Sequence, residues 1–145
     1  MATTHTEQAL THAPGTSSTK RVQIGIWLST GLFSLMFALS GAAFLAGPAN
    51  VVTMFRHLGY PDYFRQLLGV AKLLGVAALV APLPSSTLRE WAYAGFAFTC
   101  IAAAASHVMS GDPVGKALGS LFALTLLLTS YFLRRRAALG NPASA

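Results

Sequence analysis

Residues 22 to 46 read VQIGIWLSTGLFSLMFALSGAAFLA and contain no charged side chain. As a helix these 25 residues would extend about 37 Å, because each residue adds about 1.5 Å. That length is sufficient to cross a bilayer, which takes about 20 apolar residues. The preceding Lys20-Arg21 pair also fits a signal peptide, but the apolar segment of such a leader is only about 7–15 residues long. The length therefore favours a membrane anchor.

Three further apolar runs follow, each bounded by Gly or Pro. They predict helices over Asp62 to Ala81, Arg89 to Met109 and Val114 to Leu133. Pro82-Leu83-Pro84 ends the first of them, and residues Ser85 to Leu88 are expected to form a tight turn. Between spans one and two, apolar residues recur at helical spacing at Val51, Val52, Phe55 and Leu58. This pattern predicts a short amphipathic helix that lies in the headgroup plane and ends at Gly59.

The composition agrees with four membrane spans. Of the 145 residues 54% are hydrophobic and 10% are charged, whereas about a quarter are charged in a typical soluble domain. A soluble fold of this size has too little polar surface to cover four apolar segments. The net charge of +6 is concentrated at the ends of the apolar runs, which fits headgroup contacts better than a nucleic-acid interface. We therefore predict an all-α, four-transmembrane-helix bundle in a lipid bilayer, with no nucleic-acid partner.

The basic residues also predict an orientation. Residues 1–21 are expected to be a disordered tail, 22–136 the membrane domain, and 137–145 a short C-terminal tail. With four spans both termini share one side. That side carries Lys20, Arg21, Arg89 and the run Arg134 to Arg136, and the other side carries Arg56, Arg65 and Lys116. The positive-inside rule then places both termini in the cytoplasm, as in a bacterial-type plasma (inner) membrane, with Arg134 to Arg136 as a stop-transfer anchor.

Small residues predict where the spans pack together, because helices in lipid associate by close approach of their backbones. The candidate seams are Gly115, Gly119 and Ala123 in span four, Ala71 and Gly75 in span two, and Ala102 with Ser106 in span three. The single cysteine, Cys100, lies within an apolar run, and one cysteine cannot form an intrachain disulfide.

Lys72 is the ionisable residue that lies well inside a span. A lysine at the centre of a membrane helix costs about 2.5–3.5 kcal/mol on insertion scales, so such residues commonly have a function. Gly69 and Gly75 lie on the same helical face, which favours contact with another helix. The alternative is that the long side chain snorkels toward the headgroups.

Several other polar residues are expected at the level of Lys72. They are His57, Asp62, Arg65, His107, Asp112 and Lys116. We consider an outward-facing pocket among spans two, three and four that binds an anion or a quinone-like carbonyl. The alternative is that Asp62 with Arg65 or Gln66, and Asp112 with Lys116, form interfacial caps and ion pairs. The sequence holds no metal-binding spacing and no nucleophile–base pattern, so independent catalysis is the least expected function.

Four motifs in order resemble the DoxX-like family of four-helix membrane proteins. They are HLGYP at 57–61, LGVAKLLG at 68–75, EWAYAGF at 90–96, and Ser106-His107 followed by Gly111-Asp112. The resemblance extends from about Val22 to Arg136. It implies the fold and membrane location, and it adds weight to Lys72, Tyr93 and His107 as ligand-binding residues.

The resemblance also implies a function. The family takes its name from a membrane subunit associated with a thiosulfate–quinone oxidoreductase, which suggests an accessory subunit of a quinone-linked redox complex with quinone as its ligand. Two other hypotheses remain open at this point. One is a small-molecule carrier in which Lys72 lines the path, and the other is a structural assembly factor without chemistry.

Overall fold

The computed structural model describes residues 16–82 and 86–139, with side chains from Lys20 onward. The predicted tails fall largely on residues 1–15 and 140–145, which lie outside the described part, as does Ser85 of the predicted turn. The described residues form five helices: α1 (Thr16–Ala46), α2 (Ala49–His57), α3 (Asp62–Val80), α4 (Ser86–Met109) and α5 (Val114–Leu139). The described residues contain no strand, and α1, α3, α4 and α5 are long and apolar enough to cross a membrane. The prediction of an all-α four-span bundle is confirmed.

Three helix ends differ from the sequence prediction. Helix α1 begins at Thr16 rather than Val22, so residues 16–21 of the predicted tail are helical. Helix α4 begins at Ser86, and residues 86–88 form its first turn instead of a tight turn. Helix α5 continues past Arg136 to Leu139. Arg and Ala are good helix formers, and cations are favourable at a helix C-terminus, which explains the extra turn of α5.

Helix α2 has the amphipathic pattern that the sequence predicts. Phe55 is buried, whereas Arg56 and His57 are exposed. The Phe55 ring packs edge-on against Phe44 of α1, with ring centroids 4.9 Å apart. Gly59 ends the segment with a positive φ of 79°, a conformation that glycine adopts without strain.

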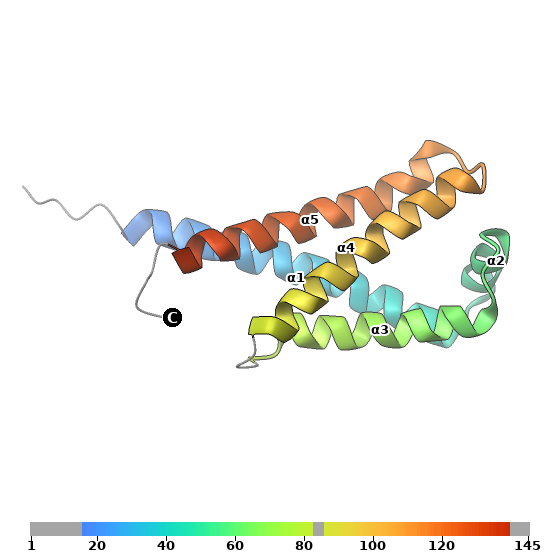
Figure 1. Ribbon diagram of the computed structural model, residues 1–145, viewed down its shortest axis with the longest axis horizontal. Helices are drawn as coiled ribbons and strands as arrows, with labels where there is room; N and C mark the ends of the chain where they lie inside the picture. The colour runs from blue at the N-terminus through green and yellow to red at the C-terminus, as the bar shows by residue number, and fades with distance from the viewer. Residues whose placement is uncertain (1–15, 83–85, 140–145) are drawn as a thin grey trace, which may run out of the picture.

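The four long helices form a closed ring of contacts. Helix α1 packs against α3 and α5, α4 packs against α5 and α3, and α2 lies against α3. Figure 1 shows that α1 and α5 run side by side and that α4 crosses diagonally between the α3 and α5 sides. The start of α1 and the end of α5 lie at one end of the bundle, called here the basic end because it carries Lys20, Arg21, Arg89 and Arg134 to Arg136. The α2 helix and the α4–α5 turn lie at the opposite end.

Aromatic rings and close backbone contacts hold the centre of the bundle. Phe33 and Phe37 of α1 stack with centroids 4.2 Å apart, and Phe96 of α4 meets both rings edge-on. Gly75 leaves room for Phe96, because a Cβ at this position would lie 2.6 Å from the ring. Gly75 therefore belongs to a helix seam, as predicted.

The backbones of α1 and α3 approach closely at Gly69, where the sequence predicted a helix contact, and at Gly41, which the sequence analysis did not identify. Gly41 of α1 and Gly69 of α3 face each other, and a Cβ on Gly69 would lie 3.0 Å from the Gly41 carbonyl oxygen. Of the seam predicted at Gly115, Gly119 and Ala123, the Ala123 position is buried as expected, whereas Gly115 and Gly119 are exposed and a Cβ on either would meet no atom within 4 Å. The buried face of α5 is instead formed by Ala117, Ala123, Leu127 and Ser130.

Candidate functional site

The Lys72 side chain points into the bundle. It is only 8% exposed, and its Nζ donates a hydrogen bond of 2.8 Å to Ser40 Oγ on α1. The same Nζ lies 3.9 Å from the centroid of the Phe44 ring and 4.9 Å from that of Phe37. Lys72 thus contacts α1, as its glycine neighbours suggested, and does not extend to the headgroups.

The Lys72 ammonium has no counterion among the described residues. The four ion pairs in this part of the chain involve other cations. An ammonium group has three N–H donors, and Ser40 accepts one of them. The faces of aromatic rings attract the remaining positive charge only weakly. A buried cation in this state can still bind an anion or a carbonyl oxygen.

A cavity of about 280 Å³ adjoins Lys72. Its walls are mainly aromatic and aliphatic side chains, and its polar lining residues are Tyr60, Lys72, Thr99, Ser106 and His107. Phe98 also lines the cavity and is 74% exposed on the outer face of α4, so the cavity borders the lipid-facing surface. Lys72 and His107, two residues singled out from the sequence, therefore share one cavity.

The position of this cavity differs in part from the prediction. Helices α3 and α4 contribute walls, as expected for spans two and three. The remaining walls come from α1, through Phe44, and from α2, through Met54 and Phe55. Span four was predicted to line the pocket and does not. Its buried face packs against α1 and α4 instead, which removes it from the cavity.

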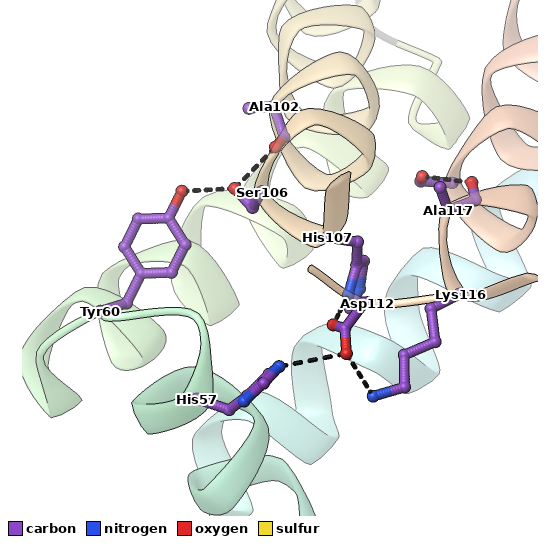
Figure 2. Close-up of polar contacts among 9 residues, drawn as sticks. His57, Tyr60, Ala102, Ser106, His107, Asp112, Lys116 and Ala117 are labelled. Atoms are coloured by element: carbon purple, nitrogen blue, oxygen red, sulfur yellow. Dashed lines mark hydrogen bonds and ion pairs between the residues drawn. The ribbon is translucent and has the colours of Figure 1, made fainter. Parts of the chain in front are cut away.

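Asp112 joins three helices at the end opposite the basic end (Figure 2). Its Oδ1 accepts hydrogen bonds from Lys116 Nζ at 2.8 Å and from His57 Nε2 at 3.1 Å, and its Oδ2 accepts one from His107 Nδ1 at 2.8 Å. The Asp112 side chain is 6% exposed. These hydrogen bonds, foremost those from Lys116 and His107, hold the pKa of the Asp112 carboxyl well below its usual value.

The Asp112 cluster also orients His107 at the cavity wall. Because Nδ1 donates to the carboxylate, the acceptor of a neutral His107 ring is at Nε2. Nearby, Ser106 Oγ donates to the Ala102 carbonyl and accepts from the Tyr60 hydroxyl at 2.7 Å (Figure 2). The Tyr60 contact ties the segment after α2 to α4 across the cavity.

Asp62 and Arg65 do not line the cavity. Arg65 is buried, and its Nε donates to Asp62 Oδ1 at 2.9 Å while its Nη1 donates to the Phe44 carbonyl near the end of α1. A Cβ on Gly47 would lie 3.0 Å from the same Nη1. Arg65 therefore caps the Phe44 carbonyl, one of the last four carbonyl groups of α1. This pair matches the predicted alternative of a cap and an ion pair.

Tyr93 does not line the Lys72 cavity and lies toward the basic end. Its hydroxyl is 2.8 Å from Ser130 Oγ, and Ser130 in turn hydrogen-bonds to Thr30 Oγ1. All three residues are buried, so these hydroxyl groups link α1, α4 and α5 inside the bundle.

The seven predicted site residues thus fall into four groups. Lys72 and His107 line the cavity, His57 and Asp112 belong to the hydrogen-bonded cluster that holds His107, Arg65 caps α1 and pairs with Asp62, and Tyr93 lies toward the basic end. Sequence reasoning missed Ser40, Phe44 and Tyr60. One signal was present, since Phe33, Phe37, Ser40 and Phe44 recur at steps of three and four along one face of α1.

Comparison with known proteins supports the resemblance noted from the motifs. A search of curated proteins and a search of solved structures each returned no match. Residues 28–130 match the sequence profile of the DoxX-like family, a range that includes Lys72, His107 and Asp112. This chain, a membrane protein with four apolar spanning helices, therefore belongs to the DoxX-like family.

Proposed function

We propose that the protein binds a small carbonyl-bearing ligand of the quinone class in the Lys72 cavity, as an accessory subunit of a quinone-linked membrane redox system. The observation that carries this proposal is the buried Lys72 ammonium, which lacks a carboxylate partner among the described residues and lines an apolar cavity. Ligand sites are typically apolar pockets with a few polar groups that fix the orientation of the ligand.

The chemistry of the cavity fits a quinone head group. Its aromatic walls favour a flat ring, and a Lys72 N–H donates to a ring carbonyl oxygen in a charge-assisted hydrogen bond. The volume of about 280 Å³ is at the low end for ligand pockets and suits a head group whose tail remains in lipid. Phe98 at the lipid-facing rim supports entry of the ligand from the bilayer.

His107 supplies a second polar group on the same wall. The Asp112 carboxylate holds Nδ1 of His107, and an imidazole ring that carries a proton on both nitrogens donates from both. In that form Nδ1 remains bound to Asp112, and Nε2–H is available to a ligand oxygen. We infer that Lys72 binds one oxygen of the ligand and that His107 adjusts its orientation.

Binding of a short-chain benzoquinone to the protein in nanodiscs tests the proposal. Lys72→Met keeps the volume of the side chain and removes the charge, and we expect it to weaken binding about tenfold or more, since a hydrogen bond to a charged group is lost. The control is Lys20→Met, which removes an exposed lysine at the basic end. Equal affinity in all three proteins would contradict the proposed site.

The redox partner needs a second measurement. We expect a mild-detergent pull-down of the full chain to recover a membrane redox enzyme and bound quinone, and Lys72→Met to lose the quinone. Substrate uptake into proteoliposomes that Lys72→Met abolishes would support a carrier instead. A folded Lys72→Met protein that keeps its partners and its quinone would support a purely structural role.

A further inference from the structure

A second cavity, of about 560 Å³, lies at the basic end, separate from the Lys72 cavity. It is formed by the start of α1, the first turns of α4 and the last turns of α5. Arg89, Arg134 and Arg135 line it together with one acidic residue, Glu90. Three cations thus face one carboxylate, and the cavity has an excess of positive charge.

The arginines in this cavity have donors without acceptors. The Nε atoms of Arg89 and Arg134 are buried and hydrogen-bond to no described residue. No carboxylate in the described part of the chain forms an ion pair with any of the three cavity arginines. A buried donor without an acceptor costs about 1–3 kcal/mol, more if it is charged. An anion in the cavity would supply the negative charge that these arginines lack among the described residues.

The three arginines of the run Arg134 to Arg136 do not all line the same cavity. Arg134 and Arg135 line the basic-end cavity, whereas Arg136 borders a different groove, beside Thr129 and Phe132. A stop-transfer anchor requires only that all three are charged near the headgroups. The separate placement of Arg134 indicates an additional role for it.

The remaining lining residues suggest what the anion is attached to. Tyr93 and Tyr131 line the same cavity, with ring centroids 5.4 Å apart. They offer an apolar surface beside the arginines. Planar guanidinium groups match the geometry of phosphate oxygens and bind them through paired hydrogen bonds.

We propose that the basic-end cavity binds a phosphate-bearing anion, held between Arg89 of α4 and Arg134 of α5. The shared chemistry is a phosphate group, which either the headgroup of an anionic lipid or a free phosphate can supply. This site is independent of the proposed quinone cavity, because the two have no lining residue in common.

Two probes distinguish the sources of the phosphate. Inorganic phosphate is titrated calorimetrically into the full chain in detergent, at an ionic strength held constant with chloride. Phosphatidylglycerol is supplied in nanodiscs of phosphatidylcholine, and the copies retained on the protein are counted by native mass spectrometry. We expect saturable binding of at least one probe to the wild-type protein.

Arg134→Gln is the test variant and Arg136→Gln is its matched control, because both remove one positive charge from the same end of the same helix. We expect Arg134→Gln to weaken binding about tenfold or more and Arg136→Gln to change it less than about twofold. Arg89→Gln tests the same cavity from α4, should Arg134→Gln fail to give a single folded species on size exclusion.

Each binding result either supports the proposed phosphate site or contradicts it. Selective loss of phosphatidylglycerol supports a lipid headgroup as the ligand, and selective loss of inorganic phosphate supports a free phosphate compound. Equal losses in Arg134→Gln and Arg136→Gln would overturn the proposal, since they indicate only general attraction to negative charge. Absence of saturable binding of both probes to the wild-type protein would also overturn it.

Discussion

The Lys72 Nζ lies 3.9 Å from the centroid of the Phe44 ring, so a cation of α3 rests on an aromatic face of α1. Phe44 also lines the Lys72 cavity and packs against Phe55 of α2. The Phe44 ring therefore contacts both the Lys72 ammonium, which is proposed to bind the ligand, and α2, which contributes to the cavity wall. The contact between Lys72 and Phe44 links the position of α2 to the environment of the ammonium.

A double-mutant cycle measures this contact. We expect Phe44→Leu to destabilise the wild-type protein more than it destabilises the Lys72→Met variant, because only the ammonium interacts with the ring quadrupole. The coupling free energy should be about 0.5–2 kcal/mol, the range for a desolvated cation–π pair. Unfolding by SDS in mixed micelles, followed by circular dichroism, gives the four stabilities. Additive effects of the two substitutions would show that the ring acts only by filling space.

The Asp112 cluster predicts a dependence of stability on pH. The folded-state pKa of Asp112 is lowered by its hydrogen bonds to Lys116 and the two histidines, so Asp112 contributes stability that is fully present above its unfolded pKa of about 3.9. That contribution is lost as the pH falls from this value toward the lower folded pKa. We expect Asp112→Asn to lower the Tm by a few degrees at pH 7, and the difference from wild type to shrink below about pH 4.

Thermal unfolding in detergent from pH 7 to pH 3 checks this expectation. Glu90→Gln is the control, because it makes the same chemical change at a residue that forms no ion pair with another described residue. A Tm difference between wild type and Asp112→Asn that stays constant down to pH 3 would argue against the assignment of the effect to the carboxylate charge.

The spans could be predicted from the sequence because they depend on local pattern, whereas the burial of Lys72 was one of two alternatives that the sequence left open. Long apolar runs require lipid, and the glycines around Lys72 mark a face that meets another helix. The partner could not be predicted, since Ser40 is 32 residues away and is brought to Lys72 only by the crossing of α1 and α3. Helix pairing depends on that crossing, which short motifs do not encode.

Arg65 and Tyr93 show why a set of polar residues in a motif is not yet a site. Arg65 lies at the expected level, but its guanidinium binds the Phe44 carbonyl and Asp62 instead of facing the cavity. Tyr93 shares a helical face with His107 but is 14 residues away, or about 21 Å along the helix axis. Sequence spacing predicts the face of a residue, whereas its depth and partner depend on the neighbouring helices.

Alanine substitution is expected to affect stability differently at Gly69, which faces Gly41 across the crossing of α1 and α3, and at Gly119, which is exposed on α5. Gly69→Ala would place a Cβ 3.0 Å from the Gly41 carbonyl oxygen, and the backbone there cannot move aside without separating α1 from α3. We expect a loss of about 1–3 kcal/mol in stability, as for other overpacked interiors. Gly119→Ala meets no atom within 4 Å and should be neutral or stabilising by up to about 1 kcal/mol, because Ala favours helix. Unfolding in mixed micelles compares the two variants, and a destabilised Gly119→Ala protein would indicate that the exposed face of α5 contacts a second copy.

Ser130 is the central hydroxyl of the chain from Thr30 to Tyr93, and it is 1% exposed. Ser130→Ala would leave the Thr30 and Tyr93 hydroxyls without their shared partner inside the bundle, and a buried polar group without a hydrogen bond is costly. We expect a loss of about 1–2 kcal/mol, since hydrogen bonds between membrane helices are each modest and two are removed together. Ser120→Ala is the matched control, because the Ser120 hydroxyl bonds only to the Ala117 carbonyl of its own helix. If Ser130→Ala and Ser120→Ala unfold at the same SDS fraction, the hydrogen bonds among Thr30, Ser130 and Tyr93 do not hold α1, α4 and α5 together. The packing of Phe33, Phe96 and Leu127 alone would then account for the stability of this part of the bundle.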